Sequence, residues 1–472
     1  MNISSQPDNL IAVRRWLALA VVSLLVAGLL SLMLIVGRVP PFSEWLTADP
    51  GFFRRALVVH VDLALIVWFY AFATALFLLI PSPDRSSRPR HTATLGATGV
   101  LAMVLSAGFK DATPILANYV PVLDHGLFLA GIFAFGVSIV LTLSDRRLLT
   151  TSTTSSIIPA MAIPGLKAMA VVVFIATVTF ALSFATTPRG LAPEVYYELL
   201  FWGGGHVLQV ASMLTMLVVW LILLTGVLGR EPFSRRAALI LFVILAAPQL
   251  VAPILASLGT TTPLYHTGFT RLMQFGIFPP VLVFLGLCLR AVWTDIAARK
   301  ISGRGLLDPR LIGFLASASL CLLGFVLGAM ITGSNTMIPA HYHASLGAVT
   351  VSLMTVTFVL LEPLGLSLGK GRLFRMARVQ PLIFGAGQMI FAMGFAIAGA
   401  YGLGRKAYAA DQAIRSSGEV AGLVIMGAGG LLAIVGGLLF LVLTVAAWRM
   451  KRLSLKRSPK WTKNPRCTPS RS

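Results

Sequence analysis

Two histidines stand two positions apart at residues 341 and 343, where a long apolar run begins. Histidine is scarce in this chain, with seven among 472 residues. In an α-helix, residues i and i+2 point about 200° apart, so His341 and His343 would lie on opposite flanks of one helix. Such a helix can present one imidazole ligand to each of two neighbours. The alternative for an isolated pair is two ordinary histidines at a membrane interface.

The composition indicates a membrane protein with many spans. The chain is 57% hydrophobic and only 11% charged, and its mean hydropathy is +0.87. These values exclude a soluble globular protein. Its three cysteines, Cys288, Cys321 and Cys467, are isolated in the sequence. We therefore expect neither covalently attached c-type heme nor a binuclear copper site built on cysteines.

Runs of roughly 20 apolar residues predict twelve membrane-spanning helices, and hence an all-α membrane protein. They are expected at residues 16–37, 55–81, 93–109, 119–143, 157–185, 194–226, 236–258, 271–293, 310–333, 341–364, 380–402 and 420–448. The first run is too long for the core of a signal peptide, so we expect it to be retained.

Three regions are predicted on this basis. Residues 1–15 would be a cytoplasmic segment, and residues 16–448 would be a single transmembrane domain. Residues 449–472 would form a basic, disordered cytoplasmic tail.

The positive charges support this topology. If the N-terminus is cytoplasmic, the inner segments hold 29 of the 38 Lys and Arg residues, and the outer segments hold nine. This asymmetry follows the positive-inside rule and predicts that both termini are cytoplasmic in a bacterial inner membrane. The net charge of +22 therefore faces anionic membrane lipid, and we expect no nucleic-acid partner.

Six histidines fall in the outer half of the predicted bundle, in even-numbered spans or just before them. They are His60, His125, His206, His266, His341 and His343. Ionisable residues within a membrane are costly and usually mark function. Several imidazoles at one depth, with few cysteines or paired carboxylates, suit iron porphyrin or copper better than zinc or calcium.

Three motifs stand out together: a histidine early in the second span, Trp-Gly-Gly-Gly-His at 202–206, and His-Tyr-His at 341–343. With twelve spans, they resemble subunit I of the heme–copper oxidase superfamily over nearly the whole chain. The resemblance is to the branch of C-family cytochrome c oxidases and nitric oxide reductases. Residues 118–125 and 335–343 look like less characterised, nitric-oxide-reductase-like members of that branch. The resemblance implies a helical bundle of the cytochrome c oxidase subunit I type.

The resemblance also implies cofactors and ligands. Two hemes, of b type or a variant, and one non-heme metal, copper or iron, are expected. His60 and His343 would be the axial ligands of a low-spin heme. His341 would hold a high-spin heme with an open face. His206 would bind the second metal, and His266 is the other candidate ligand.

The metal region departs from the family pattern. The family normally supplies a His-His pair in the loop that here covers residues 259–270, and this loop contains only His266. Oxidases of the mitochondrial type carry a tyrosine four residues after the first copper histidine, where this chain has Val210. Two imidazoles are thus the protein ligands that the sequence offers to the second metal.

Other polar residues are candidates for a proton path or for support of the ligands. These are Glu198, Gln209, Tyr265 and Asp62. His125 is either a further ligand or a packing histidine, for which Asp124 would supply a hydrogen-bond partner.

Several functions are compatible with these residues. The first is the catalytic subunit of a terminal-oxidase-like complex that reduces dioxygen to water. The second is a nitric oxide reductase that makes nitrous oxide, and the third is a diheme electron-transfer cytochrome without a catalytic metal. A transporter is disfavoured because paired midplane charges and inverted repeats are not visible. Electrons would come from a small subunit with a c-type heme or copper, or from quinol.

Overall fold

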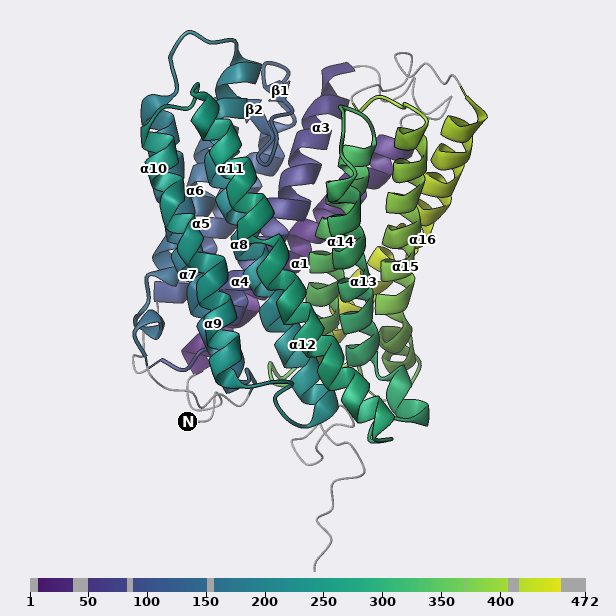
Figure 1. Cartoon of the computed structure of the whole chain (residues 1–472). Coiled ribbons are helices and arrows are strands. Elements are labelled where there is room, and N and C mark those ends of the chain that lie inside the picture. The colour runs from purple at the N-terminus through teal and green to yellow at the C-terminus, as the bar shows by residue number, and fades with distance from the viewer. Residues whose placement is uncertain are drawn as a thin grey trace, which may run out of the picture. The chain divides into compact units, whose positions relative to one another are not determined.

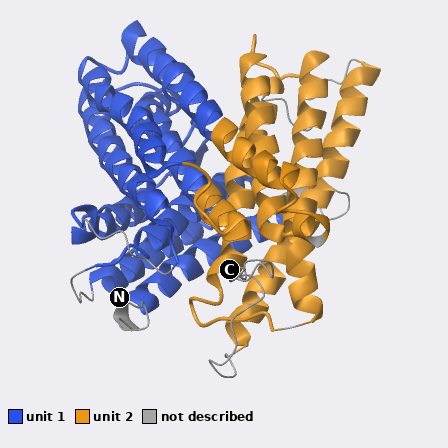
Figure 2. Cartoon of the chain, turned by 60° about the horizontal axis from the view of Figure 1, so that its bottom comes forward, with its two compact units in different colours: residues 1–218, 234–284 blue, residues 219–233, 285–472 orange. Residues whose placement is uncertain are grey.

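The computed structural model describes residues 7–36, 50–82, 88–150, 157–369, 371–405 and 416–450. Figure 1 shows that these residues are mostly helical. The chain forms two compact units, coloured separately in Figure 2. Unit 1 covers residues 1–218 and 234–284, and unit 2 covers residues 219–233 and 285–472. The predicted tail beyond residue 450 lies outside the described residues.

Unit 1 begins with α1 and ends within α12. Its elements are α1 (Pro7–Val36), α3 (Pro50–Asp62), a π-helical turn (Leu63–Val67), α4 (Trp68–Phe77), α5 (Arg88–Ser106), β1 (Thr113–Ile115), β2 (Val122–Asp124), α6 (Gly126–Leu143), 3-10 turns (Arg146–Leu148 and Ala160–Ala162), α7 (Ile163–Thr186), most of α8 (Pro193–Leu228), α9 (Arg235–Ala246), a 3-10 turn (Ala247–Val251), α10 (Ala252–Ser257), α11 (Pro263–Gly276) and the start of α12 (Phe278–Ala297).

Unit 2 contains the remainder of α8 and α12 and four further long helices. These are preceded by a 3-10 turn (Gly303–Leu307) and are α13 (Pro309–Ala329), α14 (Met337–Leu360), α15 (Arg372–Ala400) and α16 (Ser417–Arg449).

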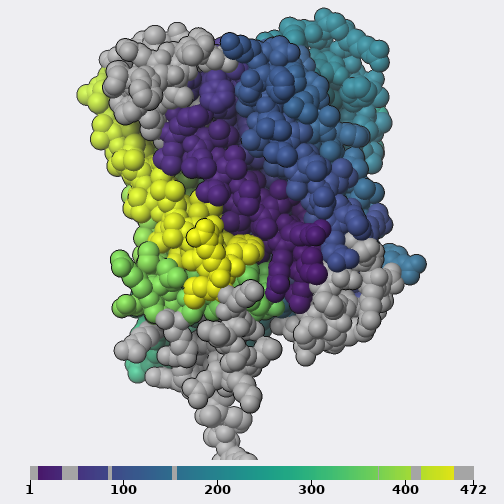
Figure 3. Space-filling model, turned by 180° about the vertical axis from the view of Figure 1, so that it is seen from behind, coloured from purple at the N-terminus to yellow at the C-terminus, as the bar shows by residue number. Residues whose placement is uncertain are grey.

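Helical segments occupy all twelve predicted spans, and the all-α membrane fold is confirmed. Among the described residues, eleven helices are long and apolar enough to cross a membrane. The third predicted span corresponds to α5, which is not among these eleven helices. It begins with Arg88 and Arg90, which lower its hydropathy. It nevertheless packs along α1 and α6. Figure 3 shows α1 as a purple band on the surface, with blue segments of the same unit beside it.

The fourth predicted span begins later than the sequence suggested. Residues 119–125 were expected to be helical, but α6 begins at Gly126. Strands β1 and β2 precede it as an antiparallel pair, with Thr113 opposite Asp124. Pro121 explains the difference, because proline disfavours a helical residue before it. Apolar residues around Pro121 had made the hydrophobic run look continuous.

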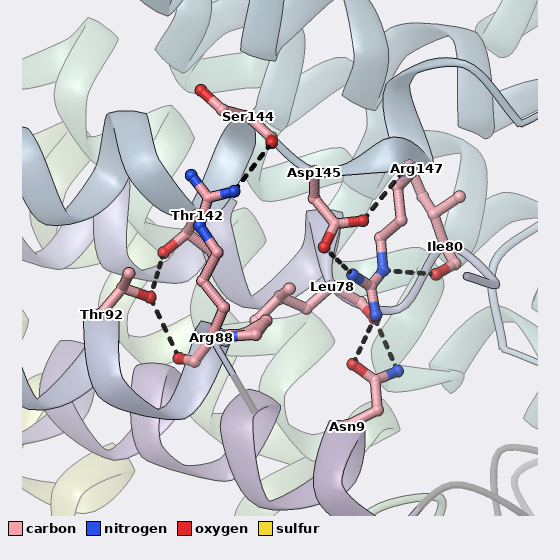
Figure 4. A network of polar contacts seen from close by, with 10 residues as sticks. Asn9, Leu78, Ile80, Arg88, Thr92, Thr142, Ser144, Asp145 and Arg147 are labelled. Carbon is pink, nitrogen blue, oxygen red and sulfur yellow. Dashed lines mark hydrogen bonds and ion pairs between the residues drawn. The ribbon is translucent and has the colours of Figure 1, made fainter. Parts of the chain in front are cut away.

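One end of unit 1 is joined by a polar network (Figure 4). Arg147 lies after α6 and is only 3% exposed. Its guanidinium donates to the Ile80 carbonyl at 2.9 Å and to Oδ1 of Asn9 at 2.8 Å, and it pairs with Asp145 at 2.8 Å. Asn9 in turn donates to the Leu78 carbonyl at 3.0 Å. The start of α1, the residues after α4 and the residues after α6 therefore share one end, as the predicted alternation requires.

Contacts at the opposite end of unit 1 also agree with the predicted alternation of the spans. Arg55 near the start of α3 donates to the carbonyl of Ala107, after α5, at 2.9 Å. In unit 2, Arg230 after α8 pairs with Asp295 in α12 at 2.7 Å. At the other end of that unit, Thr336 before α14 donates to the carbonyl of Leu403, after α15, at 2.9 Å. Within each unit, the ends meet as alternating spans predict.

Helices α15 and α16 pack closely through glycines. A Cβ at Gly387, Gly394 or Gly429 would overlap backbone atoms of the facing helix. Small residues at such positions let two membrane helices approach each other. By contrast, a Cβ at Gly427 would have no atom within 4 Å.

Candidate functional site

His60 lies near the end of α3, in unit 1. Its Nδ1 is 2.8 Å from the carbonyl oxygen of Ala27 in α1. A carbonyl oxygen can only accept, so Nδ1 carries the proton and Nε2 keeps its lone pair. The contact fixes both the tautomer and the direction of the ring. His60 is therefore prepared to bind a metal ion through Nε2.

His341 is held in the same way in unit 2. Its Nδ1 is 2.6 Å from the carbonyl oxygen of Gly324 in α13. One turn further along α13, Gly328 leaves room for the ring, because a Cβ there would lie 2.7 Å from Nδ1. The imidazole thus sits against the backbone of α13, and only glycine at residue 328 permits this approach.

His343 contacts a different helix. Its ring stacks on Phe395 of α15 at 5.6 Å between centroids, with an angle of 11° between the planes. Phe391 meets the same ring edge-on at 4.8 Å. His341 therefore faces α13 and His343 faces α15, so the prediction that the pair lies on opposite flanks of one helix is confirmed.

His206 is buried in α8, with 5% of its surface exposed. Its Nδ1 is 2.7 Å from the carbonyl oxygen of Trp202, one turn earlier in the same helix. Its Nε2 is 2.8 Å from the hydroxyl of Tyr119. Because Nδ1 donates to Trp202, Nε2 accepts, and the Tyr119 hydroxyl is the donor.

Three histidines thus share one arrangement: His60, His206 and His341 each direct Nδ1 at a backbone carbonyl. Ligating histidines usually donate their second ring nitrogen in this way, which orients the ring and raises its basicity. The donor chemistry of His60 and His341 fits axial ligation of heme iron. His60 belongs to unit 1 and His343 to unit 2, so their pairing on one heme stays a prediction.

The segment before β2 is clamped onto α8. The backbone N–H of Asn118 donates to one carboxylate oxygen of Glu198 at 2.8 Å, and the Asn118 amide donates to the other at 2.5 Å. Tyr119 follows with φ of +68°, a conformation that non-glycine residues rarely adopt. Glu198 and His206 are eight residues apart, on one face of α8. Glu198, predicted as part of a proton path, therefore holds Asn118 with both of its oxygens.

Three consecutive glycines let aromatic rings approach α8 just before His206. A Cβ at Gly203 would lie 2.8 Å from the Phe269 ring and from the Tyr265 hydroxyl. A Cβ at Gly204 would overlap Phe180 of α7, and one at Gly205 would overlap Tyr119. The glycines of the 202–206 motif therefore make room for the aromatic wall around His206.

Tyr265 and His266, at the start of α11, play different parts. The buried Tyr265 hydroxyl accepts from the Gly203 N–H and donates to the Leu199 carbonyl, each at 2.9 Å. It thereby bridges two backbone groups one turn apart in α8. His266 is half-buried, with its ring 5.2 Å from that of Trp202. Trp202 also contacts the His206 ring at 4.8 Å, so it adjoins both predicted metal ligands.

The two remaining candidates for a proton path or for support of the ligands, Asp62 and Gln209, occupy separate positions. Asp62 is fully buried at the start of the π-helical turn, and neither carboxylate oxygen has a hydrogen-bond partner among the described residues. Gln209 is half-buried in α8, three residues after His206. Their proposed part in proton transfer stays a prediction.

His125 is placed differently from the sequence expectation. It caps the N-terminus of α6, where Nδ1 accepts from the Leu127 N–H at 3.3 Å, and so it does not lie inside a span. Asp124 was expected to be its partner, but Asp124 accepts from the Tyr197 hydroxyl at 2.7 Å. His125 instead lies 3.9 Å from Asp111 and stacks on Phe109. These contacts favour the packing interpretation.

The predicted site of the second metal offers two histidines, fewer than the three that the resemblance led us to expect. Among the described residues, no group of three or more His, Cys, Asp or Glu is arranged to hold a metal ion. His206 and His266 remain as the two predicted imidazole ligands, and the Tyr119 hydroxyl lies 2.8 Å from Nε2 of His206. Sequence reasoning missed Tyr119, which is 87 residues from His206, so no local spacing joins the two.

Comparisons with known proteins agree with this arrangement of helices. A family model described as "Cytochrome C and Quinol oxidase polypeptide I" matches residues 11–433. An uncharacterized protein of Aquifex aeolicus (strain VF5) is 29% identical over 350 residues, covering 74% of this chain and 84% of that protein. The uncharacterized protein RP382 of Rickettsia prowazekii (strain Madrid E) is 24% identical over 507 residues, covering 93% of this chain and 96% of that one.

A solved structure has the same fold. It is a cryo-EM structure of a heme-copper terminal oxidase dimer, with a TM-score of 0.73 and 15% sequence identity. The match covers 95% of this chain and 85% of that chain.

Proposed function

Because this chain belongs to the cytochrome c and quinol oxidase polypeptide I family, we propose that it is the catalytic subunit of a respiratory complex that reduces dioxygen to water. Two hemes, of b type or a variant, would be held by His60, His341 and His343, and a copper or iron ion by His206 and His266. Heme iron supplies one-electron transfer and, at an open axial position, a binding place for a diatomic gas.

The observation that carries this proposal is the shared anchoring of His60, His206 and His341. Each Nδ1 is held by a backbone carbonyl at 2.6 to 2.8 Å, which leaves Nε2 as the nitrogen that can ligate. Histidines that only packed in a core would not need one common tautomer. Pre-oriented imidazoles in apolar helices are what iron and copper ligation requires.

The chain's own residues would do two things in the reaction. Anchored imidazoles hold the metal ions without reorientation. Aromatic rings around His206, including Trp202 and Phe269, exclude water from the place where gas would bind. The Tyr119 hydroxyl lies 2.8 Å from Nε2 of His206, at the edge of the place where the metal would bind.

Nitric oxide reduction to nitrous oxide is the second candidate. It is favoured by the single histidine of the loop at 259–270 and by Val210 at the position of the oxidase tyrosine. Reduction of nitric oxide needs two electrons and no such tyrosine. A diheme cytochrome without a catalytic metal is the third candidate, and it would carry electrons only.

Partners and location follow from the same proposal. Electrons would come from a small membrane-anchored subunit with a c-type heme or copper, or from quinol bound directly. The complex would lie in a bacterial inner membrane among its lipids, with both termini cytoplasmic. The excess of basic residues in the inner segments supports this orientation.

The test is the cofactor content of the full chain purified in detergent. Reduced-minus-oxidised spectra with and without carbon monoxide would be combined with heme extraction and mass-spectrometric metal analysis. Two hemes per chain, one of which binds carbon monoxide, with about one non-heme metal would support a catalytic site. Consumption of dioxygen or of nitric oxide with a chemical reductant then separates the first two candidates. Two hemes without a third metal would favour the electron carrier, and protein without heme would overturn the proposal.

A further inference from the structure

We propose that Tyr119 is a ligand of the non-heme metal and binds it through the phenol oxygen, beside Nε2 of His206. This inference rests on the proposed function, because it requires a metal at His206. It also changes the expected ligand set, since the sequence offered only two imidazoles, His206 and His266, for this metal.

The direction of the hydrogen bonds is the first step. Nδ1 of His206 donates to the Trp202 carbonyl at 2.7 Å, so Nε2 is the acceptor of the Tyr119 hydroxyl at 2.8 Å. A metal that binds His206 takes the same Nε2 lone pair. The phenol then loses this acceptor. If it does not turn away, its oxygen stays within reach of the same metal and can bind it once the phenol proton has left.

The residues around Tyr119 hold its side chain in place and so oppose a turn of the phenol away from His206. Asn118, the preceding residue, is fixed to both carboxylate oxygens of Glu198. Tyr119 itself has φ of +68°, and its Cβ lies where a side chain at residue 205 would otherwise be. The ring also meets that of Trp202 edge-on at 5.8 Å. A strained residue that its neighbours hold from several sides is characteristic of a functional site.

The spacing of the two donor atoms suits one metal ion. With metal–ligand bonds of about 2.0–2.1 Å, two donors 2.8 Å apart subtend an angle of about 85–90° at the metal. This angle fits neighbouring ligands in tetragonal or octahedral copper and iron sites better than tetrahedral zinc. Because the Nε2 lone pair points at the Tyr119 oxygen in this structure, the two side chains must turn slightly for both donor atoms to point at one metal.

The exchange of proton for metal balances. One metal–oxygen bond forms, the phenol O–H bond breaks, and one proton leaves to the solvent for each metal ion bound. The phenolate adds a negative charge to a site that otherwise offers neutral imidazoles. An anionic oxygen ligand favours the higher oxidation state of iron or copper, because its charge offsets that of the ion.

The experiment compares Tyr119→Phe with Tyr197→Phe in the purified, heme-containing full chain. Tyr197 is the matched control: its buried hydroxyl donates to Asp124 at 2.7 Å, and no contact with His206 is involved. Resonance Raman spectra would be recorded on protein grown with unlabelled or ring-deuterated tyrosine. Non-heme metal per heme would be measured on the same samples.

We expect metal-bound phenolate bands in the unaltered protein and in Tyr197→Phe, and we expect these bands to shift with deuteration. In Tyr119→Phe the bands should disappear, and metal affinity should fall at least about tenfold, while the heme content stays that of the unaltered protein. If Tyr119→Phe fails to retain heme, the isotope shift in the unaltered protein decides the question.

The inference would be overturned by heme and non-heme metal without phenolate bands, or by bands and metal that are unchanged in Tyr119→Phe. Heme without any non-heme metal would also overturn it. Absence of heme is a different result, because it would refute the proposed function itself.

Discussion

Replacement of Gly328 by alanine should selectively impair the site of His341. The new Cβ would lie 2.7 Å from Nδ1 and 2.8 Å from Cε1 of that ring, whereas ordinary contact begins at 3.4 Å. The imidazole must therefore retreat by about 0.7 Å from α13. Its hydrogen bond to the Gly324 carbonyl, now 2.6 Å, would lengthen to about 3.3 Å, beyond the usual range.

The substitution has unfavourable and favourable effects on the stability of the protein and on heme affinity. Overpacking costs about 1–3 kcal/mol, and loss of an orienting partner usually lowers the affinity for a ligated metal about 10–100-fold. The substitution of glycine by alanine within a helix returns about 0.5–1 kcal/mol. We therefore expect modest destabilisation of the protein, about 1–2 kcal/mol, together with at least about a tenfold loss of affinity for the heme at His341.

The assay is the carbon monoxide difference spectrum of purified Gly328→Ala protein, normalised to total heme. The carbon-monoxide-binding heme should decrease, and the low-spin heme should remain. Gly427→Ala is the control, because a Cβ there has no atom within 4 Å and should be neutral or slightly stabilising. If Gly328→Ala binds carbon monoxide as the unaltered protein does, His341 does not hold the gas-binding heme in the way inferred.

Two other substitutions test the site and the fold. His60→Ala should remove the low-spin heme spectrum and leave carbon monoxide binding in place, and a spectrum with both hemes would contradict the role given to His60. Arg147→Lys keeps the charge but loses the planar fork that binds Ile80 and Asn9, so a thermal unfolding assay should report a loss of about 2–4 kcal/mol. Arg146→Lys, at an exposed position, should change stability by less than about 0.5 kcal/mol, and equal effects of the two substitutions would refute the assignment.

Much of the fold could be predicted because a membrane span can be recognised from the composition of a short stretch of sequence. A run of apolar residues needs no knowledge of its neighbours, so the segments at the twelve predicted positions were found. The β1–β2 pair was missed because apolar residues around Pro121 extended the fourth run. A proline between apolar residues was the signal that could have ended the span.

The site was only partly predictable for a different physical reason. His341 and His343 could be placed on opposite flanks, because helical geometry fixes their relative direction. The groups that orient the rings of His60 and His341 are the backbone carbonyls of Ala27 and Gly324, and every residue has such a carbonyl. No residue type therefore marks them in the sequence. The position of Tyr119 could likewise not be predicted from the sequence, because its contact with His206 depends on the packing of distant segments.

The three glycines before His206 have a consequence for how relatives of this protein can diverge. Each lies against its own rings: Gly203 against Phe269 and Tyr265, Gly204 against Phe180 and Gly205 against Tyr119. A larger residue becomes acceptable at any of these positions only after every ring that lies against it has become smaller. The order of substitutions is therefore constrained, and a lineage that has lost those rings can lose the glycine afterwards. Among related sequences, each glycine should vary together with its own rings and independently of the other two glycines.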